Sequence, residues 1–186
     1  MSIIKIAITG NTKGLGKELS LRFDNVVGFT SDNLPIKFVD EIVKLSTDCD
    51  VFINNAYDDF NQTKLLMAIY EAWKDTDKTI VNIVSRSKYP NISKGFMYSA
   101  SKASLSHLSN SLRLISDKKC RIIDINVGLL NSKLPSLSYK ELADIIIWSI
   151  EQPKHIEIGE ISVWHTTPYK KISQMKDELK SYKSTF

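Results

Sequence analysis

The chain has 186 residues, of which 42% are hydrophobic and 25% are charged, and its formal net charge is +4 at pH 7. This length is enough for a domain with a sizeable core, and the composition is ordinary for a globular protein. The 25 Lys and Arg residues are scattered along the chain rather than gathered in one stripe, which argues against a nucleic-acid-binding protein.

The sequence carries no sign of export, of membrane insertion or of a metal centre. Cys49 and Cys120 belong to no CxxC pair, so we expect neither a disulfide nor a zinc site. The two histidines His155 and His165 lack the spacing of metal ligands. The N-terminal apolar run is too short for a signal peptide, and no stretch reaches the ~20 apolar residues of a membrane span. We therefore expect a cytoplasmic protein without membrane contact.

Short β-rich segments alternate with helical patterns, which predicts parallel strands joined by crossover helices. In chain order we expect strand Ile3–Thr9, helix Gly14–Phe23, strand Val26–Phe29, helix Ile36–Leu45, strand Val51–Asn54, helix Thr63–Lys74, strand Thr79–Val84, helix Phe96–Ser116, strand Arg121–Val127, helix Lys140–Glu151 and strand Glu160–Trp164. Residues 1–186 should thus form one α/β domain around an open, doubly wound parallel sheet of about six strands, with helices on both faces.

A further helix is expected at about residues 170–182, after the last strand. Ile172, Met175, Leu179 and Tyr182 recur there at three- and four-residue spacing opposite several lysines, which is the pattern of an amphipathic helix. Its apolar face would either pack on its own domain, which we favour, or form a dimer contact.

A glycine-rich turn joins the first expected strand to the first helix. Glycines are needed where the backbone turns tightly and where a pyrophosphate must approach the main chain, and the helix N-terminus behind them offers free N–H groups. The spacing is not that of a Walker A sequence. We expect the turn to bind the phosphates of a dinucleotide through Gly10, Asn11, Thr12, Lys13, Gly14, Leu15 and Gly16.

The residues after the second strand favour NADP over NAD. A carboxylate about 20 residues beyond the first glycine would hold the ribose 2′-hydroxyl of NAD. Thr30 and Ser31 stand there instead and can donate hydrogen bonds to a 2′-phosphate, and Lys13 would add a positive charge. Asp32 keeps NAD open, because a shift of one or two residues would bring its carboxylate near the ribose.

Four motifs in this order resemble the short-chain dehydrogenase/reductase family. They are the glycine turn, Asn54-Asn55-Ala56 after the third strand, Ser85 after the fourth, and Tyr98-x-x-x-Lys102 on the next helix. Ser85 precedes Tyr98 by thirteen residues, the usual interval in that family. The resemblance covers about residues 3 to 164. It implies a Rossmann-like fold and an NAD(P)-dependent oxidoreductase that acts on CH–OH or C=O groups of a small molecule, commonly as a homodimer or homotetramer.

The spacing of Tyr98 and Lys102 has a physical meaning of its own. Residues four apart lie on one helix face, and an ammonium beside a tyrosine hydroxyl favours the phenolate. We expect Tyr98 to act as general acid and base, and Ser85 to hydrogen-bond the substrate oxygen. The resemblance further implies that Lys102 holds the nicotinamide ribose. A second such pair, Tyr70 and Lys74, precedes the serine strand and is interpreted as an ordinary helix pair.

The resemblance adds further candidates. It places Asn55 and Ala56 at the cofactor, and it likens Gly128 and Ser132 to a segment that contacts the nicotinamide carboxamide. Asn61 completes a proton relay in many relatives, but it would serve equally well as a helix N-cap. Both interpretations of Asn61 stay open.

The chain also departs from the family. Only one helix fits before the strand entering Asn54, where relatives usually have a further helix and a strand that helps to hold the adenine. We therefore expect a truncated sheet edge. Tyr57 stands where relatives usually carry Gly, and only residues 133–138 separate Ser132 from the next helix, which leaves no room for a substrate lid. A dinucleotide-binding sensor or scaffold without catalysis is the alternative function.

Overall fold

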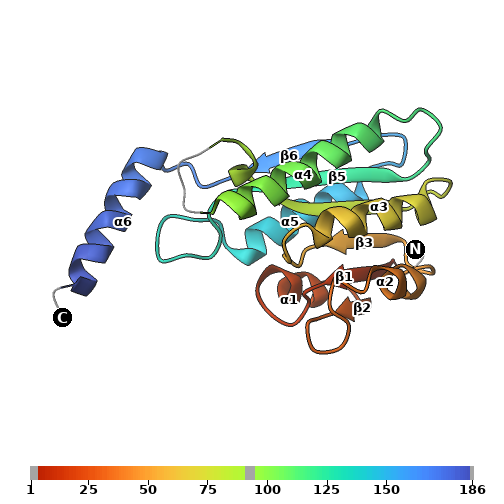
Figure 1. The fold of residues 1–186 in the computed structure, drawn as a ribbon, viewed down its shortest axis with the longest axis horizontal. Coiled ribbons are helices and arrows are strands. Elements are labelled where there is room, and N and C mark those ends of the chain that lie inside the picture. Colours follow the sequence, from red (N-terminus) through yellow and green to blue (C-terminus); the bar gives the residue numbers. More distant parts are fainter. Residues whose placement is uncertain (1–3, 91–94, 185–186) are drawn as a thin grey trace.

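Six parallel strands form one sheet in the order β2-β1-β3-β4-β5-β6 (Figure 1). The computed structural model describes residues 4–90 and 95–184, with the backbone alone at Tyr169 and residues 178–184. The strands are β1 Lys5–Thr9, β2 Asn25–Phe29, β3 Val51–Asn54, β4 Thr79–Ser85, β5 Arg121–Val127 and β6 Glu160–Val163. The predicted α/β class and the six-stranded parallel sheet are confirmed.

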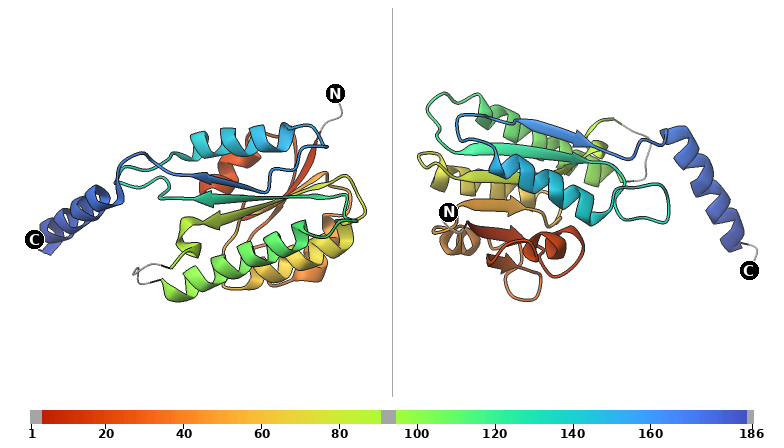
Figure 2. Two further views of the ribbon diagram at one scale, coloured as in Figure 1. Left: turned by 90° about the horizontal axis from the view of Figure 1, so that it is seen from above. Right: turned by 180° about the vertical axis from the view of Figure 1, so that it is seen from behind.

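Helices cover both faces of the sheet (Figure 2). One face carries α1 Gly14–Ser20 and α5 Tyr139–Glu151, and the other carries α2 Val39–Leu45, α3 Asn61–Trp73 and α4 Phe96–Arg113. Central strands send alternate apolar side chains to each side, so the sheet separates two apolar clusters. In β3, for example, Phe52 packs toward α2, α3 and α4, and Ile53 toward α1 and α5.

The strand order brings the ends of β1 and β3 side by side. The chain leaves β1 toward β2 on one side and returns to β3 on the other, and in an open α/β sheet ligands bind outside the carboxyl ends of the strands at such a reversal. Helix α2 alone links β2 to β3, and β2 is the edge strand of the described sheet. The truncated edge expected from the sequence is therefore present.

Two helix boundaries differ from their predicted positions because of local turns. Helix α2 begins at Val39 rather than Ile36, because the Phe38 amide donates to the Pro35 carbonyl and closes a turn first. Ile36 is nevertheless buried, as a loop residue that falls into the apolar pattern. Helix α1 ends at Ser20, three residues earlier than the pattern predicted.

At α3 and α4 the differences are at one end of each helix. Helix α3 begins two residues early, at Asn61. Helix α4 ends at Arg113, because the amides of Leu114 and Ile115 bond to carbonyls three residues back and tighten the last turn.

The C-terminal helix α6, Tyr169–Ser184, extends away from the sheet (Figures 1 and 2). The expected packing on its own domain is therefore not found. The helix is rich in lysine, and Ile172 and Met175 on its predicted apolar face are only half-buried. Leu179 and Tyr182 of that face lie outside the described side chains.

Within the described part of the chain, no helix has both the length and the apolar character that crossing a membrane requires. Cys49 and Cys120 are both free and buried. The same residues include no group of three or more His, Cys, Asp and Glu side chains placed to hold a metal ion.

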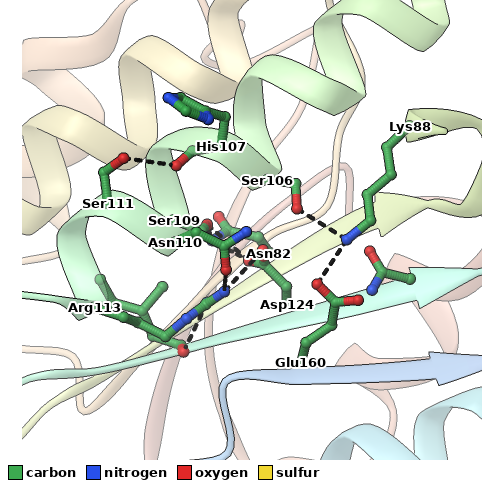
Figure 3. Close-up of polar contacts among 12 residues, drawn as sticks. Asn82, Lys88, Ser106, His107, Ser109, Asn110, Ser111, Arg113, Asp124 and Glu160 are labelled. Carbon is green, nitrogen blue, oxygen red and sulfur yellow. Dashed lines mark hydrogen bonds and ion pairs between the residues drawn. The ribbon is translucent and has the colours of Figure 1, made fainter. Parts of the chain in front are cut away.

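A row of polar side chains crosses the middle of the sheet, beneath α3 and α4. Asn54, Asn82 and Asp124 are in register on β3, β4 and β5, and all three are fully buried. The Asn82 amide accepts a hydrogen bond from Asn54 Nδ2 (3.1 Å) and donates to Asp124 Oδ1 (3.1 Å) and to Ser109 Oγ (3.0 Å). Figure 3 shows Asn82, Ser109 and Asp124 together with Arg113, whose Nη2 lies 3.6 Å from Asp124 Oδ2. Asn82 therefore joins three elements at the centre of the fold.

We expect Asn82→Leu to lower the free energy of unfolding by about 2–4 kcal/mol, because it removes partners from Asn54, Ser109 and the buried Asp124 carboxylate. The same change at the exposed Asn25 of β2 should alter it by less than about 0.5 kcal/mol. Urea denaturation of both variants measures the difference, and similar stability for the two would contradict this description of the polar row.

Candidate functional site

A cavity of about 250 Å³ lies at the carboxyl ends of the strands, where the order reverses. It brings together side chains that come from the glycine turn, from the ends of β3, β4 and β5, and from α4 and α5. The residues that line it are Leu15, Asn55, Tyr57, Ile83, Val84, Ser85, Tyr98, Lys102, Val127, Gly128, Leu130 and Tyr139.

Ser85 and Tyr98 face this cavity from neighbouring elements. Ser85 is the last residue of β4, and its Oγ accepts the Ser87 amide (3.1 Å), which fixes the start of a short 3-10 helix at Arg86–Lys88. Tyr98 is in the first turn of α4, and its ring meets Tyr57 edge-to-face with 4.9 Å between centroids. The serine selected by the thirteen-residue interval is therefore the one that lines the cavity.

Lys102 lies one helical turn after Tyr98, and its side chain is buried, with 3% of the residue exposed. Its Nζ donates to Gln62 Oε1 (2.6 Å) and to the Ile83 carbonyl (2.7 Å). The same ammonium lies 5.6 Å from the Tyr98 ring centroid and 5.7 Å from that of Tyr57. An ammonium has three N–H donors, so one remains for a ligand in the cavity.

The ammonium of Lys102 has no carboxylate partner among the described residues. Burial therefore acts unopposed and lowers the pKa of Lys102 to about 8. The group is still mainly charged at neutral pH, on the same helix face as Tyr98. A strongly shifted buried group in a cavity is a frequent mark of a functional site.

Gln62 was not among the residues predicted from the sequence. Its Nε2 donates to the backbone carbonyl of Asn54 (2.8 Å), which orients the side-chain amide, and its own backbone carbonyl accepts a hydrogen bond from Asn54 Nδ2 (2.9 Å). That orientation points Oε1 at Lys102. Only its position beside Asn61 at the start of a helix would have drawn attention to it.

The glycine turn has the backbone that its sequence predicts. Gly10 and Gly14 have φ of +73° and +58°, a region that other residues rarely adopt. A Cβ on Gly16 would lie 2.0 Å from the Gly10 carbonyl oxygen, so only glycine permits this close packing of turn and helix. Asn55 anchors the turn from β3, because its Nδ2 donates to the carbonyls of Thr9 (2.9 Å) and Gly10 (3.3 Å).

The polar side chains of Asn11 and Lys13 belong to the turn itself. Asn11 packs against Gly28 of β2, and its Oδ1 is buried without a partner among the described residues. Lys13 is exposed at the position before α1. These groups and the glycine backbone fit a dinucleotide, since they leave donors and acceptors open at the site of close approach.

The segment after β2 forms a closed turn of its own. Thr30 Oγ1 donates to Asn33 Oδ1 (3.0 Å), and Ser31 Oγ donates to Asp32 Oδ1 (3.2 Å). Ser31 and Asp32 are exposed. The candidates for the 2′-position therefore lie together at the open edge of the sheet.

Asn61 and Ser132 are among the predicted site residues that do not line the cavity. Asn61 Nδ2 donates to Asp58 Oδ2 (2.8 Å), and the side chain of Asn61 caps no helix, because it is the first residue of α3 itself. Ser132 is exposed in the loop before α5, where its Oγ accepts the Leu134 amide (3.0 Å).

The second Tyr–Lys pair lies away from the cavity, as expected. Tyr70 is buried in the apolar cluster under α3, and Lys74 forms an exposed ion pair with Glu71 (2.8 Å). Besides Tyr98, two further tyrosines line the cavity, Tyr57 and Tyr139; Tyr139 lies against Gly14 and was not predicted.

The buried charge of Lys102 should make the free energy of unfolding depend on pH. Between pH about 8 and 10.5 the unfolded chain holds a proton on this lysine that the folded protein has lost, so wild-type stability should rise with pH relative to Lys102→Met. The gain should approach about 3 kcal/mol. Urea denaturation of both proteins at pH 7.5 and pH 10 tests it, and a difference independent of pH would show that the ammonium is not desolvated.

Comparison with known sequences gives a partial match. No family model matches the chain. A stretch of 94 residues is 28% identical to an uncharacterised oxidoreductase of Staphylococcus saprophyticus and covers 45% of this chain and 40% of that protein. The match therefore spans less than half the length of this curated relative.

Solved structures match over nearly the whole chain. Serine dehydrogenase from Escherichia coli has a TM-score of 0.74 at 16% identity, over 89% of this chain and 99% of that chain. An alcohol dehydrogenase from Thermococcus sibiricus has 0.73 at 16%, over 89% and 98%. A short-chain dehydrogenase from Burkholderia cenocepacia has 0.70 at 18%, over 94% of each chain. The chain thus has the fold of the short-chain dehydrogenases and reductases, as its motifs led us to expect.

Proposed function

We propose that the protein is an NAD(P)-dependent oxidoreductase of the short-chain dehydrogenase/reductase type, which reduces a carbonyl or oxidises an alcohol. The observation that carries the proposal is the shared cavity of Ser85, Tyr98 and Lys102, next to the anchored glycine turn. The oxidoreductase with 28% identity supports it.

We propose NADP(H) as the preferred cofactor, held by the turn over residues 10–16. Lys13 is exposed beside the turn, and Thr30 and Ser31 provide hydroxyls after β2. A closed form of serine dehydrogenase was solved with NADP+, and the Burkholderia enzyme was solved with NADP, which supports the choice by analogy of fold. Asp32 leaves NAD as the second candidate.

The proposed chemistry divides into a hydride transfer and a proton transfer. The bound nicotinamide supplies or accepts the hydride, with its two electrons, at the carbonyl carbon. In reduction, Tyr98 donates its hydroxyl proton to the carbonyl oxygen, so that the C=O π bond becomes a C–H and an O–H bond; in oxidation the phenolate takes the proton back. Ser85 donates a hydrogen bond to the same oxygen and stabilises its developing charge.

Lys102 would serve both parts of this reaction. Its charge lies one helical turn from Tyr98 and stabilises the phenolate that remains after proton donation. Lys102 Nζ donates two hydrogen bonds, to Gln62 Oε1 and to the Ile83 carbonyl, and these hold the ammonium in place. Its third N–H would bind the nicotinamide ribose. Gln62 acts here as a positioning residue.

A dinucleotide-binding sensor without catalysis is the second candidate. The edge position of β2 favours it, because the strand that helps to hold the adenine in relatives has no counterpart in the described sheet. The presence of Ser85, Tyr98 and Lys102 in one cavity favours the enzyme, since a sensor has no need of all three.

NADPH should raise the melting temperature by about 5–10 °C at one hundred times its dissociation constant, and NADH by less. Gly16→Ala should abolish most of this shift, because its Cβ would displace the Gly10 carbonyl. Gly159→Ala, remote from the turn, is the matched control and should keep the shift. If neither nucleotide changes the melting temperature, both candidate functions are wrong.

Tyr98→Phe should lower carbonyl-dependent NADPH oxidation by about 10²- to 10⁴-fold while the NADPH-induced thermal shift is retained. Tyr70→Phe, in the other Tyr–Lys pair, should leave turnover within about two-fold of wild type. Wild-type turnover in Tyr98→Phe would refute the mechanism. Binding of NADPH without turnover of any carbonyl compound by the wild type would instead identify a sensor.

A further inference from the structure

Arg86 and Trp164 form a cation–π pair beside the cavity, next to two of its lining residues, Ser85 and Gly128. The Arg86 guanidinium lies over the Trp164 indole, 4.1 Å from the ring centroid. Arg86 directly follows Ser85 at the end of β4, and Trp164 directly follows β6. The end of β5 lies between them, and its next residue, Gly128, lines the cavity. The arginine therefore reaches across the cavity rim over about two strand spacings, roughly 10 Å.

The three strand ends fit one another closely. A Cβ on Gly128 would lie 2.7 Å from Trp164 Cβ, so the absence of a side chain there lets the tryptophan come next to the cavity. The Gly128 amide also donates to the Val163 carbonyl (2.8 Å), which fixes the backbone just before the indole. Trp164 is 48% exposed, and its ring provides a fixed platform for the guanidinium.

Lys88, two residues after Arg86 on the same short 3-10 helix, is a cation with an ion-pair partner and serves as a comparison. Its Nζ lies 2.6 Å from Glu160 Oε2 and 3.0 Å from Ser106 Oγ, and only 7% of its side chain is exposed (Figure 3). Arg86 is exposed and forms no ion pair with the described residues. Stacking orients the guanidinium plane and leaves its N–H edge open, as two-point binding of a planar anion requires.

We propose that Arg86, held by Trp164, is the subsite for a carboxylate of the substrate, so that the substrates are short oxo acids and the corresponding hydroxy acids. This inference rests on the proposed function, because it places the carboxylate relative to a carbonyl at Ser85 and Tyr98. The distance from Ser85, at the end of β4, to the Arg86 guanidinium over Trp164, after β6, suits a substrate whose carboxylate is a few bonds from the reacting carbon. A phosphate shares the chemistry, and a separate arm of the test distinguishes it.

The test compares matched carbonyl compounds with NADPH as reductant. Acetoacetate and methyl acetoacetate differ in the negative charge, and dihydroxyacetone phosphate and dihydroxyacetone provide the phosphate arm. Wild type should prefer acetoacetate to its ester by at least about ten-fold in kcat/KM. Arg86→Gln should lower kcat/KM for acetoacetate by about 10- to 100-fold, mainly through KM, and leave the ester within about two-fold.

Two further variants complete the experiment. Trp164→Leu should give a smaller loss, confined to the acid, because the guanidinium is present but no longer oriented. Lys119→Gln removes the same charge at the opposite end of β5 and should leave the acid-to-ester ratio unchanged. Melting temperatures of all variants establish that they are folded.

The outcomes separate the inference from the function on which it rests. Equal turnover of acid and ester, or an equal loss for both in Arg86→Gln, would refute the carboxylate subsite and leave the oxidoreductase in place. A preference confined to the phosphorylated ketone would refute the carboxylate assignment. Reduction of none of these compounds, by a wild type that binds NADPH and reduces another carbonyl compound, would refute the carboxylate subsite alone.

Discussion

The candidate site depends on burying the Lys102 ammonium without a neutralising carboxylate from the described part of the chain. Removing such a charge from water costs several kcal/mol, and the hydrogen bonds that the ammonium donates to Gln62 Oε1 and the Ile83 carbonyl offset only part of this cost. A methionine or leucine would fill the same space without the penalty. A costly charge that is held in one position beside Tyr98 is best explained by a function that needs a cation there.

The same hydrogen bonds connect the site to the centre of the fold. Gln62 is fixed by Asn54, and Asn54 joins the polar row that passes through Asn82 to Asp124. On the other side, Thr9 Oγ1 accepts the amides of Asn55 and its neighbour Ala56 (both 2.9 Å) and so ties β1 to β3. The glycine turn and the catalytic candidates are therefore parts of one rigid arrangement at the strand ends.

Local patterns predicted much of this arrangement. Strands buried on both faces have nearly continuous apolar sequences, and the turn glycines, Ser85 and the Tyr98–Lys102 pair are recognisable by spacing. Contacts between distant segments were not predictable in the same way. The bond of Gln62 to Lys102 joins residues 40 positions apart, and the stacking of Arg86 on Trp164 needs the order of β4, β5 and β6.

Ile36 shows a case in which a local pattern predicted structure that is not present. It fits the helical apolar pattern, but a turn closed at Pro35 leaves it in a loop that is buried all the same. The spacing of apolar residues indicates which side chains are buried, and it indicates a helix only indirectly. The wrong expectation that α6 packs on its own domain has a similar origin. An amphipathic pattern predicts a helix but does not identify the surface that its apolar side will contact.

The most direct test of the account is transfer of deuterium from NADPH labelled at nicotinamide C4 to a carbonyl compound, followed by mass spectrometry of the alcohol. With each C4 face labelled in turn, the account predicts one non-exchangeable deuterium at the former carbonyl carbon with one of the two labels. If a protein that binds NADPH gives no deuterium-labelled alcohol with either label, hydride transfer from the nicotinamide is ruled out and the sensor remains.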